Sequence, residues 1–132
     1  MNKLWIAVVA LALSASFAAA HEGEKGAHDE KAEAAASATT LTGELVDLGC
    51  YMDHGGKGEK HEKCAKMCVQ KGGAPLGLLT KDGALYLVVG SHADEKPYAA
   101  AKEMAGENAK LTGKVIKKGG VQSIIVSKVE KP

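Results

Sequence analysis

The residues best suited to chemistry are concentrated near the middle of the chain. All three cysteines and two of the five histidines lie in residues 50–68. They are Cys50, His54, His61, Cys64 and Cys68. Thiolates and imidazoles are ligands that Zn²⁺ and Cu(I) accept readily in proteins. Met52 and Met67 place soft thioether sulfur in the same segment, which favours copper. The segment therefore predicts a metal site.

The spacing of these residues indicates how they converge. A helix over residues 59–70 would place His61, Cys64 and Cys68 on one face, within an arc of about 60°. We expect Cys50 to end the preceding strand, and residues 55–58, rich in glycine, to let the helix fold back over it. A Cys3His set would suit tetrahedral Zn²⁺, and two or three of the thiolates would suit Cu(I). His54 would be a fifth ligand or the hydrogen-bond partner of one, and the other interpretation is a polar loop residue with no part in the site.

Two other interpretations of the cluster stay open. Cys50 can pair with Cys64 or Cys68 in a structural disulfide that fixes the helix to the sheet, and this leaves one free cysteine. Such a protein would be a non-catalytic interaction module or an accessory subunit that binds another exported protein. Thiol redox chemistry is the third interpretation, because five lysines in residues 57–71 are expected to lower thiol pKa values. No complete catalytic set is visible, so we expect a protein that is not an enzyme.

The first twenty residues are typical of a secretory signal. Lys3 precedes an apolar run from Leu4 to Leu13, and small residues follow, with Ala18 and Ala20 before the expected cleavage point. The run is shorter than the roughly 20 residues that a membrane-spanning helix needs. We therefore expect a periplasmic or secreted protein with no stable membrane span after cleavage.

Cleavage after Ala20 would make His21 the first residue of the mature chain. Its α-amine and imidazole together can chelate Cu²⁺, so His21 is an alternative metal ligand. Residues 21–40 contain no large apolar side chain, and we expect them to form a disordered tether. On such a tether His21 would lack a rigid scaffold, and the other interpretation is an accidental first residue.

The composition of the mature chain argues against a nucleic-acid partner. Without residues 1–20 the chain has 16 Lys and 16 acidic residues, no Arg, and three Tyr as its only Phe, Trp or Tyr residues. Proteins that bind single-stranded nucleic acid normally use cationic grooves and stacked aromatic rings. We therefore expect a metal ion or another exported protein as the partner, and no nucleic acid.

Residues 41–132 form one predicted domain of strands and two helices. Strands are expected over residues 41–48, 76–80, 84–89, 109–117 and 121–129. Two of the connections are hairpin turns, at Asp82-Gly83 and at Gly119-Gly120. The helices are expected over residues 59–70 and 94–105. This order predicts a mainly β domain, a small OB-like five-stranded barrel with the helix that carries the Cys/His residues inserted after the first strand.

A short internal repeat supports this fold. Thr42-Gly43-Glu44-Leu45-Val46 recurs as Thr112-Gly113-Lys114-Val115-Ile116. A glycine at this position lets a strand coil sharply, as a small closed barrel requires. Over residues 41–131 the chain resembles small exported bacterial OB-fold proteins, in which the first and fourth strands often carry this pattern. The resemblance implies a fold and leaves the function to the Cys/His site.

Overall fold

The computed structural model describes residues 38–132 as a mainly β domain. The predicted signal of residues 1–20, His21 and the predicted tether up to residue 37 lie outside the described residues. The elements in chain order are β1 (Thr39–Asp47), α1 (Leu48–His54), a 3-10 turn (Glu59–His61), α2 (Glu62–Gln70), β2 (Leu76–Thr80), β3 (Leu85–Val89), α3 (Lys96–Glu103), β4 (Asn108–Lys118) and β5 (Val121–Glu130). The prediction of two helices is wrong, because the described chain has three α-helices.

The five strands form one sheet that closes on itself in the order β1-β2-β3-β5-β4. β1 pairs with both β2 and β4, and all pairs are antiparallel except β3 with β5. Both predicted hairpins are confirmed, since β2 pairs with β3 and β4 pairs with β5. β1 begins at Thr39, two residues before the predicted start of the domain.

The glycines of the repeated pattern lie where neighbouring strands are too close for a side chain. A Cβ atom on Gly43 of β1 would collide with the backbone carbonyl of Leu79 in β2. One on Gly113 of β4 would collide with the carbonyl of Ile125 in β5, next to a register shift between Thr112 and Gly113. The two positions are therefore restricted to glycine by contact between strands.

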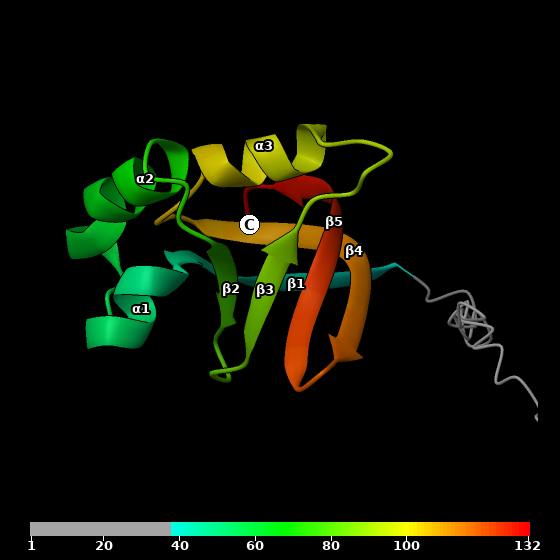
Figure 1. The fold of residues 1–132 in the computed structure, drawn as a ribbon, viewed down its shortest axis with the longest axis horizontal. Helices are drawn as coiled ribbons and strands as arrows, with labels where there is room; N and C mark the ends of the chain where they lie inside the picture. Colours follow the sequence, from blue (N-terminus) through cyan, green and yellow to red (C-terminus); the bar gives the residue numbers. More distant parts are fainter. Residues whose placement is uncertain (1–37) are drawn as a thin grey trace, which may run out of the picture. The chain divides into compact units, whose positions relative to one another are not determined.

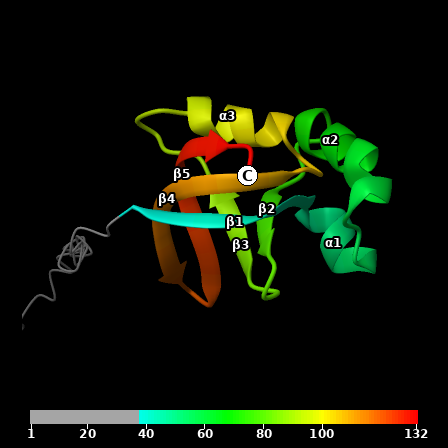
Figure 2. The same cartoon turned by 180° about the vertical axis from the view of Figure 1, so that it is seen from behind.

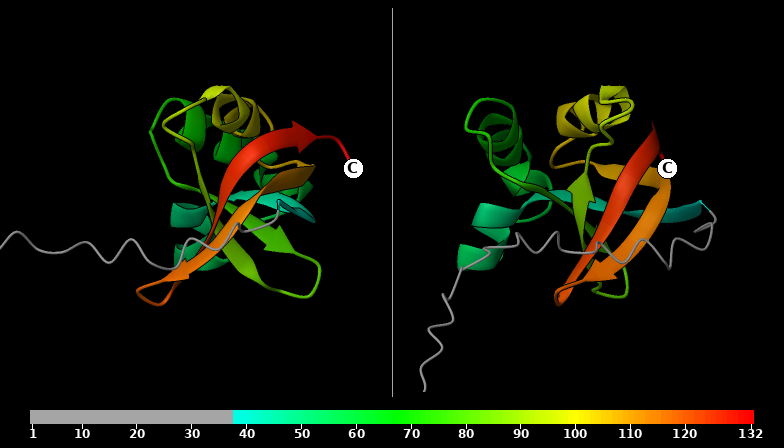
Figure 3. Two further views of the ribbon diagram at one scale, coloured as in Figure 1. Left: turned by 90° about the vertical axis from the view of Figure 1, so that its right-hand side faces the viewer. Right: turned by 45° about the vertical axis from the view of Figure 1, so that its right-hand side comes forward.

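The core fills the space inside the closed sheet and beneath two helices. Figures 1 and 2 show α3 over one end of the sheet, opposite the two hairpin turns. Figure 1 and the right-hand view of Figure 3 show α1 and α2 together at one side of the sheet. α2 contributes Ala65 and Val69 to the core, and α3 contributes Ala101. The largest fully buried apolar side chains are Leu45, Leu76, Leu78, Leu111, Ile124, Val46, Val69 and Val126.

The segment between β1 and β2 carries the Cys/His residues and differs most from the prediction. It holds α1, the 3-10 turn and α2 instead of a single helix. α1 buries none of its residues completely. It is held to the sheet by Leu48, whose backbone N–H donates to Pro75 O (3.0 Å) and whose side chain lies over Gly77. No helix among the described residues is both long enough and apolar enough to cross a membrane.

Candidate metal site

Asp47 starts the helix that carries the first cysteine. β1 ends at Asp47 and α1 follows at once, with the Asp47 carboxylate accepting a hydrogen bond from Gly49 N (2.8 Å). This is the usual N-cap arrangement, in which a short polar side chain pairs with a free helix N–H. Asp47 is only 1% exposed. Cys50 lies in the first turn of α1, so the prediction that it ends the strand is wrong.

A glycine-rich loop returns the chain from α1 to α2. Gly55 ends α1 in the left-handed conformation (φ 69°), and Gly58 N donates to the Glu44 carboxylate of β1 (2.5 Å). This bond ties the loop to the sheet. The chain then makes the 3-10 turn that ends at His61. The predicted folding back through residues 55–58 is thus confirmed, since the Cys50 sulfur and a ring nitrogen of His61 lie within 4.8 Å of each other.

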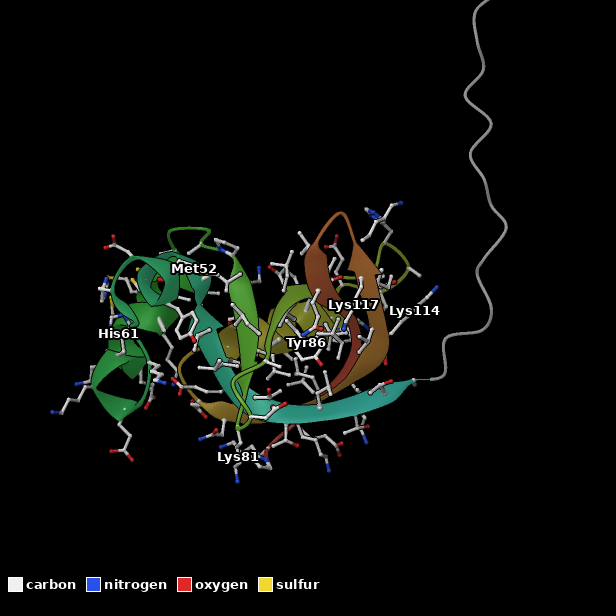
Figure 4. The ribbon with its side chains drawn as sticks, turned by 90° about the horizontal axis from the view of Figure 1, so that it is seen from below. Met52, His61, Lys81, Tyr86, Lys114 and Lys117 are labelled. Atoms are coloured by element: carbon white, nitrogen blue, oxygen red, sulfur yellow. The ribbon has the colours of Figure 1, made fainter. Side chains whose placement is uncertain are left out.

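The imidazole of His61 is packed into this loop. Its Nε2 atom is buried and has no hydrogen-bond partner. A Cβ atom on Gly56 would lie 2.6 Å from that nitrogen, so only glycine leaves room for the ring. Figure 4 shows His61 on the α1 and α2 side of the molecule, away from Lys114 and Lys117 of β4. His61 ends the 3-10 turn and is the N-cap of α2, so it stands just before the helix that carries Cys64 and Cys68 and not within it.

α2 supplies the other two thiols. Cys64 and Cys68 are one helical turn apart, and their Sγ atoms are separated by 4.0 Å. Cys64 is exposed, whereas Cys68 and Cys50 are half-buried. All three cysteines are free thiols in the structure. Their closeness would also let two of them oxidise to a disulfide after a small rotation, because an S–S bond is about 2.05 Å long.

The five predicted ligands form two groups that share one residue. Cys50, Cys64 and Cys68 have sulfur atoms that all lie within 4.8 Å of one another. Cys50, His54 and His61 form a second group with ligand atoms within the same distance. The predicted set of three cysteines and His61 does not form a single group in which all ligand atoms lie within 4.8 Å of one another. Cys50 is therefore the centre of the site.

The two histidines of this second group lie against each other. Their rings meet edge to face, with centroids 5.3 Å apart. His54 Nδ1 lies 3.2 Å from the Asp53 carboxylate, which accepts when that nitrogen carries the proton. This pairing favours the tautomer in which His54 Nε2 keeps its lone pair for a metal ion.

Asp47 also acts on the charge state of Cys50 and Cys68. Its hydrogen bond with the Cys50 thiol, together with burial, raises the pKa of Cys50 to about 12. The pKa of Cys68 is raised by its hydrogen bond with Cys64, by burial and by Asp47. Burial alone would raise the pKa of Asp47, but the bonds from Cys50, Gly49 and Cys68 lower it. The prediction that lysines lower these thiol pKa values is wrong for Cys50 and Cys68, and thiolate-based redox chemistry is disfavoured there.

The part that Asp47 plays in the site was not predicted from the sequence. The signal was present, because an aspartate at the end of an apolar strand and two residues before a cysteine fits a helix N-cap. His92, outside the Cys/His cluster, lies exposed in the loop before α3. Met52 and Met67 are 70% and 63% exposed, so their side chains point mainly to solvent.

Met52 belongs to an apolar groove beside the candidate metal site. The groove has a volume of about 290 Å³ and is lined mainly by Leu48, Met52, Leu85, Leu87 and Val121. Val121 is 50% exposed.

Comparison of the chain with protein-family models, curated proteins and solved structures gives no match.

Proposed function

We propose that this protein binds a soft or borderline metal ion, Cu(I) or Zn²⁺, through the thiolates of Cys50, Cys64 and Cys68. The observation that carries the proposal is the convergence of three sulfur atoms, from two separate helices, within 4.8 Å of one another. Thiolate sulfur selects these ions over Mg²⁺ or Ca²⁺. Three thiolates satisfy Cu(I), whereas Zn²⁺ needs a fourth ligand from an imidazole or water. We therefore propose Cu(I) as the preferred ion.

The position of the site supports a role in holding and passing on the ion. Cys64 is exposed, so one ligand is open to an exchange partner, while Cys50 and Cys68 are half-buried. The buried Asp47 accepts hydrogen bonds from the protonated thiols, and an incoming cation would replace those protons. We propose that the protein buffers, delivers or senses the metal and has no catalytic activity of its own.

We further propose an OB-like barrel in an exported protein. The strand order β1-β2-β3-β5-β4, the parallel β3–β5 pair and a helix between β3 and β4 support the fold assignment. Residues 1–20 support export, because a short apolar run follows Lys3 and ends in small residues.

Metal titration of the reduced full chain tests the proposal. The protein is titrated anaerobically with Cu(I), and separately with Zn²⁺, against a chromophoric chelator, while free thiols are counted. We expect at least one ion to be retained and the thiols to be protected from alkylation. Cys64→Ser and Cys68→Ser should each weaken retention at least tenfold. Met67→Leu, on the same helix, is the matched control and should leave it unchanged. Failure of the reduced protein to retain either ion would refute the proposal.

The apolar groove supports a second candidate, a surface that binds another exported protein. Met52 and Val121 are large apolar side chains that remain largely exposed at its rim. In this case two of the three cysteines form a structural disulfide and the protein binds no metal. A thiol count on protein purified without reductant separates the candidates, since a disulfide leaves one reactive thiol and the metal site leaves three after the ion is removed.

A further inference from the structure

The group formed by Cys50, His54 and His61 has features of a ligand site in its own right. Its ligand atoms lie within 4.8 Å of one another. The buried Nε2 atom of His61 has no hydrogen-bond partner. Leaving a buried polar atom unpaired costs about 1–3 kcal/mol, so such atoms are normally satisfied by a partner or a ligand. A metal ion bound by His61 Nε2 would satisfy it.

The surrounding residues hold both imidazoles in place for such an ion. Gly56 makes room for the His61 ring, because a Cβ atom there would lie 2.6 Å from Nε2. The Asp53 carboxylate lies 3.2 Å from His54 Nδ1, which leaves Nε2 of His54 as the ligand atom. Both features are independent of Cys64 and Cys68.

We propose that the site holds two Cu(I) ions bridged by the Cys50 thiolate, one bound also by Cys64 and Cys68 and the other by His54 and His61. The inference rests on the proposed function and adds a second ion to it. Cys50 is the only one of the five ligands that belongs to both groups. A thiolate sulfur has more than one lone pair and can bind two soft cations. Binding releases the three thiol protons to solvent and transfers no electrons.

Charge balance favours the second ion. Three thiolates and one Cu(I) carry a net charge of −2, and the carboxylate of Asp47, 1% exposed and within hydrogen-bond reach of Cys50 and Cys68, adds a further negative charge. The nearby ammonium of Lys66 is already paired with Glu62 (2.8 Å) and Glu107 (2.6 Å). Uncompensated charge in a half-buried site is unfavourable. A second Cu(I) bound by two neutral imidazoles reduces it without adding a new anion.

Stoichiometry of Cu(I) binding tests this inference. The reduced full chain is loaded anaerobically with Cu(I), passed through a desalting column and weighed by native mass spectrometry. We expect two Cu(I) per chain for the wild type and for the control His92→Ala, and one for His54→Ala and His61→Ala. One Cu(I) in the wild type would overturn the bridged pair and leave the proposed function intact. No retained Cu(I) would overturn both.

A variant outside the ligands guards against loss of fold as the cause. Gly56→Ala should displace the His61 ring and reduce binding to one Cu(I) per chain. In the His61→Ala background the ring is absent, so Gly56→Ala should have no additional effect on stoichiometry. A further loss of copper in the double variant would show that Gly56 acts through the general fold, and would contradict the role assigned to His61.

Discussion

Asp47→Asn should make the Cys50 thiol much more reactive in the metal-free protein. The hydrogen bond with the Asp47 carboxylate is the largest cause of the raised pKa of Cys50, from the ordinary 9.0 to about 12. Asparagine keeps an oxygen that can accept from Gly49 N, so the start of α1 is retained. It lacks the negative charge that disfavours the thiolate.

The size of the effect follows from the thiolate fraction. At pH 8 a thiol with a pKa of about 12 is about 0.01% thiolate, and one with an ordinary pKa is about 10% thiolate. A thiolate of lower pKa is also a weaker nucleophile, which offsets about twentyfold of this thousandfold gain. Burial persists in the variant and keeps part of the shift. We therefore expect Cys50 to be alkylated about ten to forty times faster in Asp47→Asn.

The assay is alkylation by iodoacetamide at several pH values, with the label at Cys50 measured by peptide mass spectrometry. Asp53→Asn is the matched control, because its carboxylate is 86% exposed and is paired with His54. Its Cys50 should react at the wild-type rate. Equal Cys50 rates in the wild type and Asp47→Asn would refute the role assigned to this carboxylate.

Because the pKa of Cys50 is higher in the folded protein, its contribution to stability is full below pH 9 and is lost as the pH rises toward 12. The alkaline fall in melting temperature should be smaller in Asp47→Asn.

The fold and the proposed ligand give three more expected outcomes. Gly113→Ala should lower the free energy of unfolding by about 1–3 kcal/mol in urea denaturation, because the alanine Cβ would meet the Ile125 carbonyl. Ser127→Ala is the control, and equal stability of the two variants would contradict the close strand contact. Lys66→Met should lower the melting temperature more at low salt than at high salt, because it removes ion pairs with Glu62 and Glu107. A change that does not depend on salt would contradict a stabilising role of these ion pairs. Cu(I) at one hundred times its Kd should stabilise the protein by about 2.7 kcal/mol, as measured by thermal unfolding, and a chelator should reverse the gain. An unchanged melting temperature would count against binding to the folded state.

The hairpins were predictable from the sequence because their signals are local. Asp82-Gly83 and Gly119-Gly120 lie between apolar runs, and turn chemistry of this kind depends only on adjacent residues. α1 was missed because it has only seven residues, with glycine at its second position, and buries none of them fully. A helix that short shows no apolar periodicity to detect. The pairing of β3 with β5 depends on contacts between strands far apart in the chain.

The site was predictable in its members and not in its arrangement. The clustering of cysteine and histidine identified all five candidate ligands. Their division into two groups depends on α1 and the 3-10 turn, which rotate Cys50 and His61 away from their expected positions. The part played by Asp47 was hidden because burial of a carboxylate is a tertiary property. Its N-cap position was the only local signal.

Native mass spectrometry of the full chain, expressed with residues 1–20 and purified without reductant or chelator, tests the central claim most directly. The mass distinguishes a metal ion bound to three deprotonated thiols from a disulfide, which is lighter than the reduced chain by two hydrogens. The metal proposal predicts a species carrying copper or zinc that loses the ion in acid and then shows three alkylatable thiols. A metal-free chain with one alkylatable thiol would contradict it.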